Sequence, residues 1–309
     1  MSDILQRPRQ TEFVPALLKR TLSRVSRGVI DVLLPPRCLS CGTGLAGEGA
    51  LCAPCWKEIE FIDGPVCDTC GLPFEFDEGA GVLCGACIQK RPAWHRHRSV
   101  MRYTDVSRAL ILGFKHGDRT DGAPTYGAWL KRAGLAQIRE GTIIVSVPLH
   151  RKRLFTRRYN QSALLAQALS KSLAEQTDTV VAPGLLRRTR PTASQGNLSR
   201  QARFRNVAGA FAVHPTHTAH VREAHILLID DVMTTGATIE ACASTLMRAR
   251  GGLGRCADAG TRCAPHLTPA LALKADSAFA IDSSPLMTQS GTGTTRAVLL
   301  FVMQLHGAQ

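Results

Sequence analysis

Residues 226–238 read Ile-Leu-Leu-Ile-Asp-Asp-Val-Met-Thr-Thr-Gly-Ala-Thr, and this run decides the fold. Its first four residues, Ile226 to Ile229, are apolar, which is typical of a strand buried on both faces of a parallel sheet. Two carboxylates, Asp230 and Asp231, follow where the strand ends, and open α/β sheets bind ligands at the carboxyl ends of their strands. Gly236 then lies in a turn that opens a helix. The run therefore predicts a strand, a ligand site and a helix in succession.

The second half of the run is suited to binding a sugar phosphate. Its small residues let backbone N–H groups face a phosphate, its threonine hydroxyls add donors, and the start of a helix adds a partial positive charge. The two carboxylates can accept hydrogen bonds from vicinal ribose hydroxyls. A simple helix N-cap after a strand would explain one residue and not the whole run. The expected ligand-binding residues are Asp230, Asp231, Thr234, Thr235, Gly236, Ala237 and Thr238.

On both sides of this run, strands are expected to alternate with helices. Strands are predicted over 99–103, 142–147 and 225–229, and helices over 106–115, over 126–137 and from residue 161 onward. This alternation indicates an α/β fold with a mostly parallel sheet. The buried faces of the helices on either side of the site are expected to hold Leu164, Leu165, Ala168 and Leu169, and Ile239, Cys242, Leu246 and Met247.

The charge and composition narrow the class of protein. The chain has 309 residues, 44% of them hydrophobic, and 38 Lys and Arg against 24 Asp and Glu give a net charge of +14. An excess of positive charge favours polyanionic ligands such as nucleotides, diphosphates or DNA. The apolar runs are shorter than the roughly 20 residues that span a bilayer, and the arginine-rich start lacks the pattern of a secretory signal. We therefore expect a cytoplasmic protein without a transmembrane segment, whose residues 1–36 form an amphipathic helix.

A cysteine-rich segment follows that helix, with eight of the 11 cysteines in four Cys-x-x-Cys pairs. In a reducing compartment such pairs indicate zinc rather than disulfides, and four thiolates form a closed structural site. Taken in sequence order, they predict two structural zinc ions, although a cross-braced pairing also fits the spacing. His95 and His97 could join a metal site but are expected at the surface of a basic connector, and Cys242 is expected in the core. The two predicted ligand sets are Cys38, Cys41, Cys52 and Cys55, and Cys67, Cys70, Cys84 and Cys87.

The run at 226–238 resembles the motif that binds phosphoribosyl pyrophosphate (PRPP) in type I phosphoribosyltransferases, and further motifs resemble the ComF family. Those motifs are Gly113-Phe114-Lys115-His116-Gly117-Asp118, Val147-Pro148-Leu149-His150-Arg151-Lys152-Arg153, Arg158-Tyr159-Asn160-Gln161, and the pattern between Gln195 and Phe211. The resemblance spans about Pro35 to Gly251.

The resemblance implies PRPP with Mg²⁺ as the donor, an unknown acceptor, and release of pyrophosphate. Asp230 and Asp231 are then the expected catalytic residues, and Arg151, Lys152 and Arg153 lie in the loop expected to bind the diphosphate. It also implies a link to DNA uptake and competence. A non-catalytic PRPP or nucleotide sensor, and a zinc-ribbon adaptor for DNA or a DNA-processing partner, remain alternatives.

Two further segments carry expectations of their own. Residues 186–206 contain six arginines among small polar residues and few apolar anchors, so we expect a mobile loop that closes on the ligand. After Gly251 the resemblance stops, and only Ala297 to Leu305 could form a strand or a short helix, so a shifted reading frame or an atypical C-terminus is predicted. The sheet should then lack the strand beside Ile226–Ile229 and expose an edge.

The expected domains are therefore an N-terminal helix (1–36), a double zinc ribbon (37–92), a phosphoribosyltransferase-like domain (93–252) and an atypical tail (253–309).

Overall fold

The computed structural model describes residues 36–45, 50–77, 79–116, 119–193, 195, 198–222, 224–250 and 298–304. The helix expected over residues 1–36 lies outside this part, apart from Pro36, as does the tail from 253 to 297.

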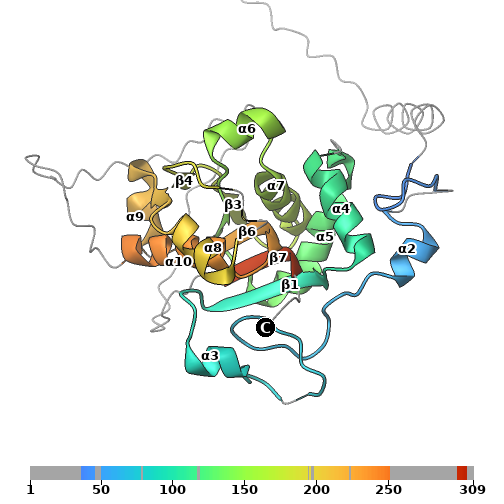
Figure 1. Ribbon diagram of the computed structural model, residues 1–309, viewed down its shortest axis with the longest axis horizontal. Coiled ribbons are helices and arrows are strands. Elements are labelled where there is room, and N and C mark those ends of the chain that lie inside the picture. The colour runs from blue at the N-terminus through green and yellow to red at the C-terminus, as the bar shows by residue number, and fades with distance from the viewer. Residues whose placement is uncertain are drawn as a thin grey trace, which may run out of the picture.

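A five-stranded parallel sheet forms the centre of the molecule (Figure 1), which confirms the α/β class. Its order is β1 (Arg96–Arg102), β7 (Val298–Gln304), β6 (Ile226–Met233), β2 (Thr142–Ser146) and β3 (Thr179–Val181). Every neighbouring pair of strands runs parallel. β6 and β2 are the apolar runs recognised in the sequence. β3 was not predicted, because three residues carry too little pattern to be recognised as a strand.

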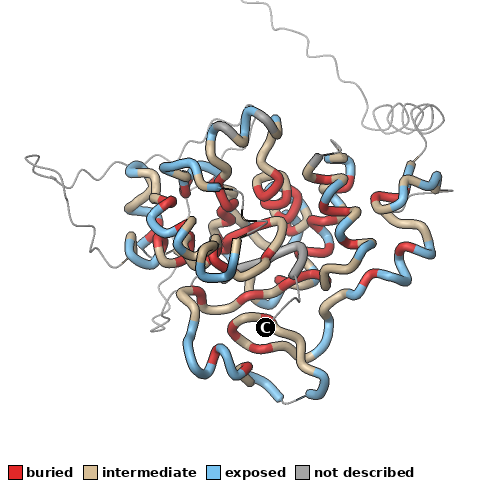
Figure 2. The backbone as a smooth tube through the Cα atoms, viewed as in Figure 1, coloured by how far each residue is buried: buried red, intermediate tan, exposed pale blue. Residues whose placement is uncertain are grey.

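Successive residues of β6 face opposite sides of the sheet and enter two different cores. Leu227 and Ile229 pack with Ile144 against α4 (Asp105–His116), α5 (Ala123–Gly134) and α7 (Gln161–Leu173). Ile226 and Leu228 lie in the second core, with α10 (Ala237–Arg250). This alternation is the two-residue period of a strand. Figure 2 shows the buried residues along the sheet and the helices packed on it.

The predicted helix faces agree with the structure at most positions. Leu165, Ala168 and Leu169 of α7 are buried, and so are Ile239, Cys242 and Leu246 of α10. Met247 was predicted to face the core but is 44% exposed. It directly follows Leu246, and adjacent helical residues point about 100° apart because a turn contains 3.6 residues.

Two segments expected to be loops contain regular structure. The basic segment after β2 continues into helix α6 (Arg151–Arg157). The arginine-rich segment contains β4 (Leu186–Arg188), which pairs antiparallel with β5 (Phe211–Val213), and helix α8 (Arg200–Val207). Leu186 at its start and Val207 directly after it are buried and anchor the segment at both ends, although it was expected to have few apolar anchors. Short helices η3 (Pro215–His217) and α9 (Thr218–Val221) lead to β6.

The sheet contains the strand beside β6 that it was expected to lack. β7 lies between β1 and β6, with Leu227 opposite Val298 and Met233 opposite Gln304. On its other side, Arg96 pairs with Val298 and Arg102 with Gln304. The expectation of an exposed edge beside β6 was therefore wrong. Residues 298–304 lie at that edge, and they come from the segment identified as able to form a strand.

The cysteine-rich segment has two similar halves. Each begins with a turn in which glycine adopts a positive φ, Gly42 at 77° and Gly71 at 67°. Each ends in a short helix, α2 (Ala53–Lys57) or α3 (Gly85–Gln89), whose N-cap is a cysteine. In both halves, the turn between paired cysteines thus presents two sulfur atoms to the same point. Among the described residues, no helix is long and apolar enough to cross a membrane.

Candidate functional site

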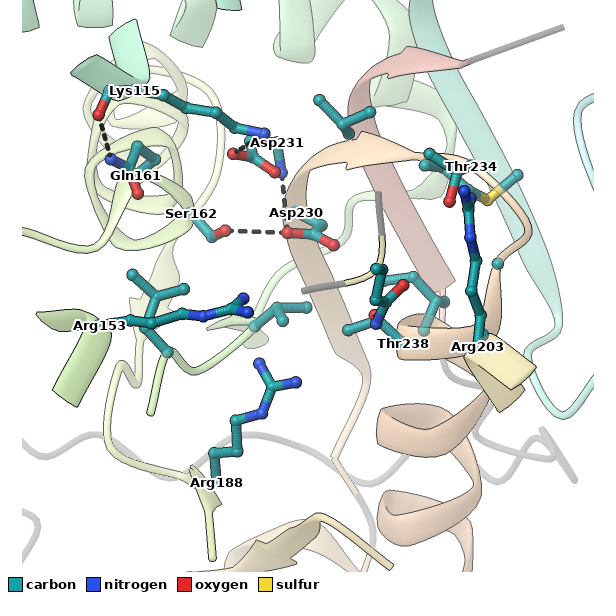
Figure 3. Close-up of a pocket in the computed structure, with 18 of the residues that line it drawn as sticks. Lys115, Arg153, Gln161, Ser162, Arg188, Arg203, Asp230, Asp231, Thr234 and Thr238 are labelled. Carbon is teal, nitrogen blue, oxygen red and sulfur yellow. Dashed lines mark hydrogen bonds and ion pairs between the residues drawn. The ribbon is translucent and has the colours of Figure 1, made fainter. Parts of the chain in front are cut away.

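A cavity of about 380 Å³ opens at the carboxyl ends of β2 and β6 and at the start of α10 (Figure 3). Helix α6, the first turn of α7, β4 and α8 complete its wall. Its polar and charged lining residues are Lys115, Arg153, Arg157, Gln161, Ser162, Arg188, Gln195, Arg203, Asp230, Asp231, Thr234 and Thr238. The cavity is therefore located where open α/β sheets bind their ligands.

Two carboxylates lie on one side of the cavity and differ in their surroundings. Asp230 is buried, and its Oδ1 accepts hydrogen bonds from Ser162 Oγ at 3.1 Å and from the backbone N–H of Asp231 at 2.9 Å. Asp231 is paired instead with Lys115, whose Nζ lies 2.9 Å from Oδ2. The pair can therefore offer acceptor oxygens to a ligand at two adjacent points.

Burial raises the pKa of Asp230 to about 7, and the neighbouring charge of Asp231 acts in the same direction. The Asp231 N–H, Lys115 and Ser162 oppose this shift without cancelling it. Near neutral pH, Asp230 is thus partly protonated, so it can either accept a hydrogen bond from a ligand hydroxyl or donate one.

Five cationic side chains, four of them arginines, line the same cavity as these two carboxylates. Figure 3 shows Arg153 and Arg188 pointing toward one another on the far side of Asp230. Burial lowers the pKa of Arg188, as does the charge of Arg153, and Arg188 Nε is buried without a hydrogen-bond partner in the described structure. An anion between the two guanidinium groups would supply the missing acceptor and relieve their repulsion.

The turn from Thr234 to Thr238 forms the remaining wall. Gly236 has a φ of 75°, a left-handed conformation that residues with a side chain rarely adopt. The hydroxyl of Thr238 accepts a hydrogen bond from Gln195 Nε2 at 3.1 Å, which ties the turn to the arginine-rich segment. Because α10 starts at Ala237, the unpaired N–H groups of its first turn lie beside the cavity.

The eight paired cysteines form two groups outside this cavity. They are Cys38, Cys41, Cys52 and Cys55, and Cys67, Cys70, Cys84 and Cys87. Within each group the four sulfur atoms lie within 4.8 Å of one another. This is the sequential grouping and not the cross-braced one. Four converging thiols fit a tetrahedral Zn²⁺ site with all positions taken by protein, so the two groups are compatible with two structural zinc ions.

Comparison with known proteins is consistent with these features. Residues 29–88 match the double zinc ribbon domain. The chain is 34% identical over 221 residues to DNA utilization protein YhgH of Escherichia coli (strain K12), covering 70% of this chain and 92% of that protein. It is 30% identical over 220 residues to Competence protein F of Haemophilus influenzae, covering 69% and 91% of the two chains.

The chain belongs to the ComF family. Competence protein ComFC of Bacillus subtilis is a more distant relative, at 23% identity over 219 residues, covering 66% of this chain and 80% of that protein.

The structure brings most of the site residues expected from the ComF resemblance to one cavity. Asp230, Asp231, Thr234, Gly236, Ala237, Thr238 and Arg153 line it. Arg151 is exposed and is not among the lining residues. Thr235 is half-buried and also does not line the cavity, and its hydroxyl is buried without a partner in the described structure. The side chain of Lys152 lies outside the description. Residues 151–153 begin a helix, and of the two side chains described there, Arg153 lines the cavity and Arg151 does not.

Other lining residues were not assigned a role from the sequence. Lys115 and Gln161 lie in two of the motifs shared with the ComF family, and that resemblance was the available signal. Ser162 directly follows the second of these motifs. Arg188 and Arg203 belong to the arginine-rich segment, where the sequence did not separate them from Arg187, Arg190, Arg200 and Arg205.

One of the two histidines near the ribbon differs from expectation, whereas His95 is half-buried. His97 is fully buried, not at the surface, with Nδ1 2.7 Å from the Cys70 carbonyl oxygen and Nε2 3.2 Å from Ser99 Oγ. Burial lowers its pKa to about 3, so it is neutral. It occupies this place because β1 begins at Arg96 and includes His97.

Proposed function

We propose that this ComF-family protein is a phosphoribosyltransferase of the type I kind, which binds PRPP with Mg²⁺ in the cavity and transfers the phosphoribosyl group to an acceptor that remains to be identified. The observation that carries the proposal is the pairing of two adjacent carboxylates at the end of β6 with four arginines in the same cavity. PRPP combines vicinal hydroxyls with phosphate and diphosphate groups, so it needs acceptors and cations at once.

Each part of the cavity then has a role. Asp230 and Asp231 accept hydrogen bonds from the ribose hydroxyls. The turn from Thr234 to Thr238, with the N-terminus of α10, binds a phosphate through backbone N–H groups and hydroxyls. Arg153 and Arg188 face the diphosphate, and a role for Arg151 and Lys152 of the same segment stays a prediction.

The reaction breaks the bond between C1 of the ribose and the diphosphate oxygen, and the electron pair leaves on that oxygen. A bond from the acceptor nucleophile to C1 replaces it. Positive charge develops on the ribose and negative charge on the leaving diphosphate. The arginines stabilise the leaving group, and the carboxylates lie near the ribose cation. Both effects are greatest at the transition state, as catalysis requires.

Two metals belong to the proposal. Carboxylate oxygens are ligands that Mg²⁺ accepts, so Asp230 and Asp231 would hold it with the diphosphate, where it neutralises charge. Each cysteine tetrad would hold one structural Zn²⁺. Zinc-binding thiols persist in a reducing compartment, so a cytoplasmic location is part of the proposal.

Pyrophosphate release tests the reaction. The full chain is incubated with PRPP, Mg²⁺ and a panel of acceptors, and pyrophosphate is measured for the wild type and for Arg188→Met. Release that depends on an acceptor and falls in the variant supports a transferase. PRPP binding without release under any acceptor would instead make the protein a non-catalytic PRPP-binding regulator.

We also propose a role in DNA uptake or use, in view of the names of its relatives and its net charge of +14. Binding by contacts to phosphates weakens steeply as salt rises. Retention of single- and double-stranded DNA by the full chain should therefore be measured between low and physiological salt. The absence of DNA retention even at low salt would restrict the function to the small-molecule site.

A further inference from the structure

The second cysteine tetrad is joined to the Thr234–Thr238 turn through one side chain. Thr69 lies in the tight turn between Cys67 and Cys70 and is buried. Its carbonyl oxygen accepts two hydrogen bonds, from the backbone N–H of His97 at 2.9 Å and from the indole Nε1 of Trp94 at 3.2 Å. The position of the Trp94 ring therefore depends on the conformation of this cysteine turn.

The other face of the Trp94 ring supports the turn at the cavity. A Cβ placed on Gly236 would lie 3.2 Å from Cη2 of Trp94, so the ring is in close contact with the backbone of the turn. Trp94 also belongs to the same buried cluster as Met233 and Ala237, which flank the turn. The adjacent backbone N–H of Ala93 donates to Glu240 Oε2 at 3.0 Å, in the first turn of α10.

The first tetrad is attached to a different part of the molecule. Arg119 donates to the carbonyl oxygens of Arg37, Cys38 and Leu39 at 3.1, 2.9 and 3.3 Å. Leu39 packs in the core with α4 and α5. The first tetrad is thus connected to the helices on one side of the sheet, whereas the second is connected to the turn that starts α10.

We propose that Trp94 is a positioning residue that couples the second tetrad to the cavity. When metal closes the tetrad, the Thr69 carbonyl fixes the Trp94 ring, and the ring holds the Gly236 turn in the conformation that presents its N–H groups to phosphate. When the tetrad opens, the ring loses its anchor and the turn loosens. Metal in the second tetrad, but not in the first, therefore raises the affinity for the phosphate ligand. The affinity part rests on the proposed function.

The positive φ of Gly236 explains why the turn needs this support. A left-handed glycine has more conformational freedom to lose than other residues, so its conformation is costly to maintain. The turn itself contributes only small side chains, and the hydroxyl of Thr235 is buried without a partner in the described structure. The aromatic wall provides packing that the turn cannot supply for itself.

Hydrogen–deuterium exchange of the full, zinc-loaded chain tests the coupling, followed at the amides of residues 234–240. Three variants are compared with the wild type. Cys84→Ser opens the second tetrad, and Cys52→Ser opens the first at the equivalent place, since each cysteine is the N-cap of a short helix. Trp94→Phe removes both the indole N–H that donates to Thr69 and the part of the ring that contacts Gly236, so it breaks the link between the two turns.

Exchange in the turn should accelerate about fivefold in Cys84→Ser and in Trp94→Phe, which is the change expected from losing one net hydrogen bond. Cys52→Ser should leave it at the wild-type rate. Equal acceleration in the two cysteine variants, or wild-type exchange in Trp94→Phe, would overturn the coupling. If Cys84→Ser fails to fold, the Trp94→Phe comparison decides alone.

Calorimetry with Mg²⁺ and PRPP on the same proteins separates this inference from the proposed function. The affinity should fall by a similar factor in Trp94→Phe and stay unchanged in Cys52→Ser. A wild type that does not bind PRPP would contradict the proposed function and the affinity part of the coupling. The exchange comparison would still show whether Trp94 links the tetrad to the turn.

Discussion

Lys115 Nζ lies 2.9 Å from Asp231 Oδ2, and both side chains are more than four-fifths buried. The lysine is in the last turn of α4, and its carbonyl oxygen accepts a hydrogen bond from Gln161 Nε2 at 3.3 Å. The residue before it, Phe114, is held by the Tyr159 hydroxyl, which donates to its carbonyl at 2.7 Å. Two motifs far apart in the sequence therefore fix the cation that neutralises one of the paired carboxylates.

Replacing Lys115 with methionine should weaken the protein and its ligand site together. Without the lysine, two adjacent carboxylates repel each other in a partly buried place, so the free energy of unfolding at pH 8 should fall by about 1–3 kcal/mol. PRPP affinity should fall about tenfold or more, because Asp231 loses the cation that holds its carboxylate in place. Urea unfolding and calorimetry measure the two effects.

Lys131→Met is the matched control, since Lys131 donates to the Ser172 carbonyl between α5 and α7. It should change stability modestly and leave PRPP affinity unchanged. Equal loss of affinity in both variants would mean that Lys115 acts only through general stability.

The buried carboxyl of Asp230 should make stability depend on pH. Its pKa is about 7 in the folded protein against an ordinary 3.8, so the folded state holds more protons between those values. The contribution of Asp230 to the free energy of unfolding therefore falls as pH rises from 4 to 7. Above pH 7 the buried carboxylate is charged, and the protein is destabilised by the full amount.

Asp230→Asn removes that cost while its side-chain oxygen can still accept from Ser162. The variant should exceed the wild type by about 1–3 kcal/mol at pH 8, with the difference vanishing near pH 4. Urea unfolding at both pH values, without ligand or Mg²⁺, gives the comparison. A variant less stable than the wild type at pH 8 would show that the charged form is stabilised in the fold.

Metal analysis of the purified protein should find two zinc ions per chain. A structural site of four cysteines contributes about 10–16 kcal/mol of apparent binding energy in small peptides, and a ribbon of this size has little core of its own. Chelation should therefore unfold the ribbon before the α/β domain, as followed by limited proteolysis. One zinc per chain, or disulfides in place of metal, would contradict the two-site account.

The strand β7 should be required for folding of the sheet. It pairs with β1 on one side and β6 on the other, so removing residues 251–309 would leave two strands with unpaired backbone groups in the centre of the sheet. We expect that truncated chain to aggregate or to lose its cooperative thermal transition. A truncated chain with the wild-type melting temperature would show that β7 is dispensable.

The sequence predicted those elements whose residues carry a strong local pattern. The four apolar residues of β6 and the turn at Gly236 each indicate one structure. The cysteine spacings predict metal sites but fit both a sequential and a cross-braced pairing. Arg153 and Arg188 could not be distinguished from neighbouring arginines, because their facing positions depend on how α6 and β4 pack. Burial of His97 depends on the exact start of β1, which periodicity leaves uncertain.

The C-terminal strand shows the limit of local reasoning most clearly. Val298–Gln304 was recognised as able to form a strand, but 47 residues separate it from the end of α10. Its place between β1 and β6 follows from long-range pairing, which a local pattern does not specify. The shifted reading frame near Gly251 stays a prediction, and resequencing the gene, with translation of the alternative frame, tests it.

The most direct test of the account is calorimetric titration of PRPP with Mg²⁺ into the wild type and into the variant with both Asp230→Asn and Asp231→Asn. We predict one PRPP bound per wild-type chain and about 100-fold weaker binding in the variant, from the loss of two charged hydrogen-bond acceptors. The variant should keep a cooperative unfolding transition. Equal affinity in the two proteins would contradict the assignment of the PRPP site.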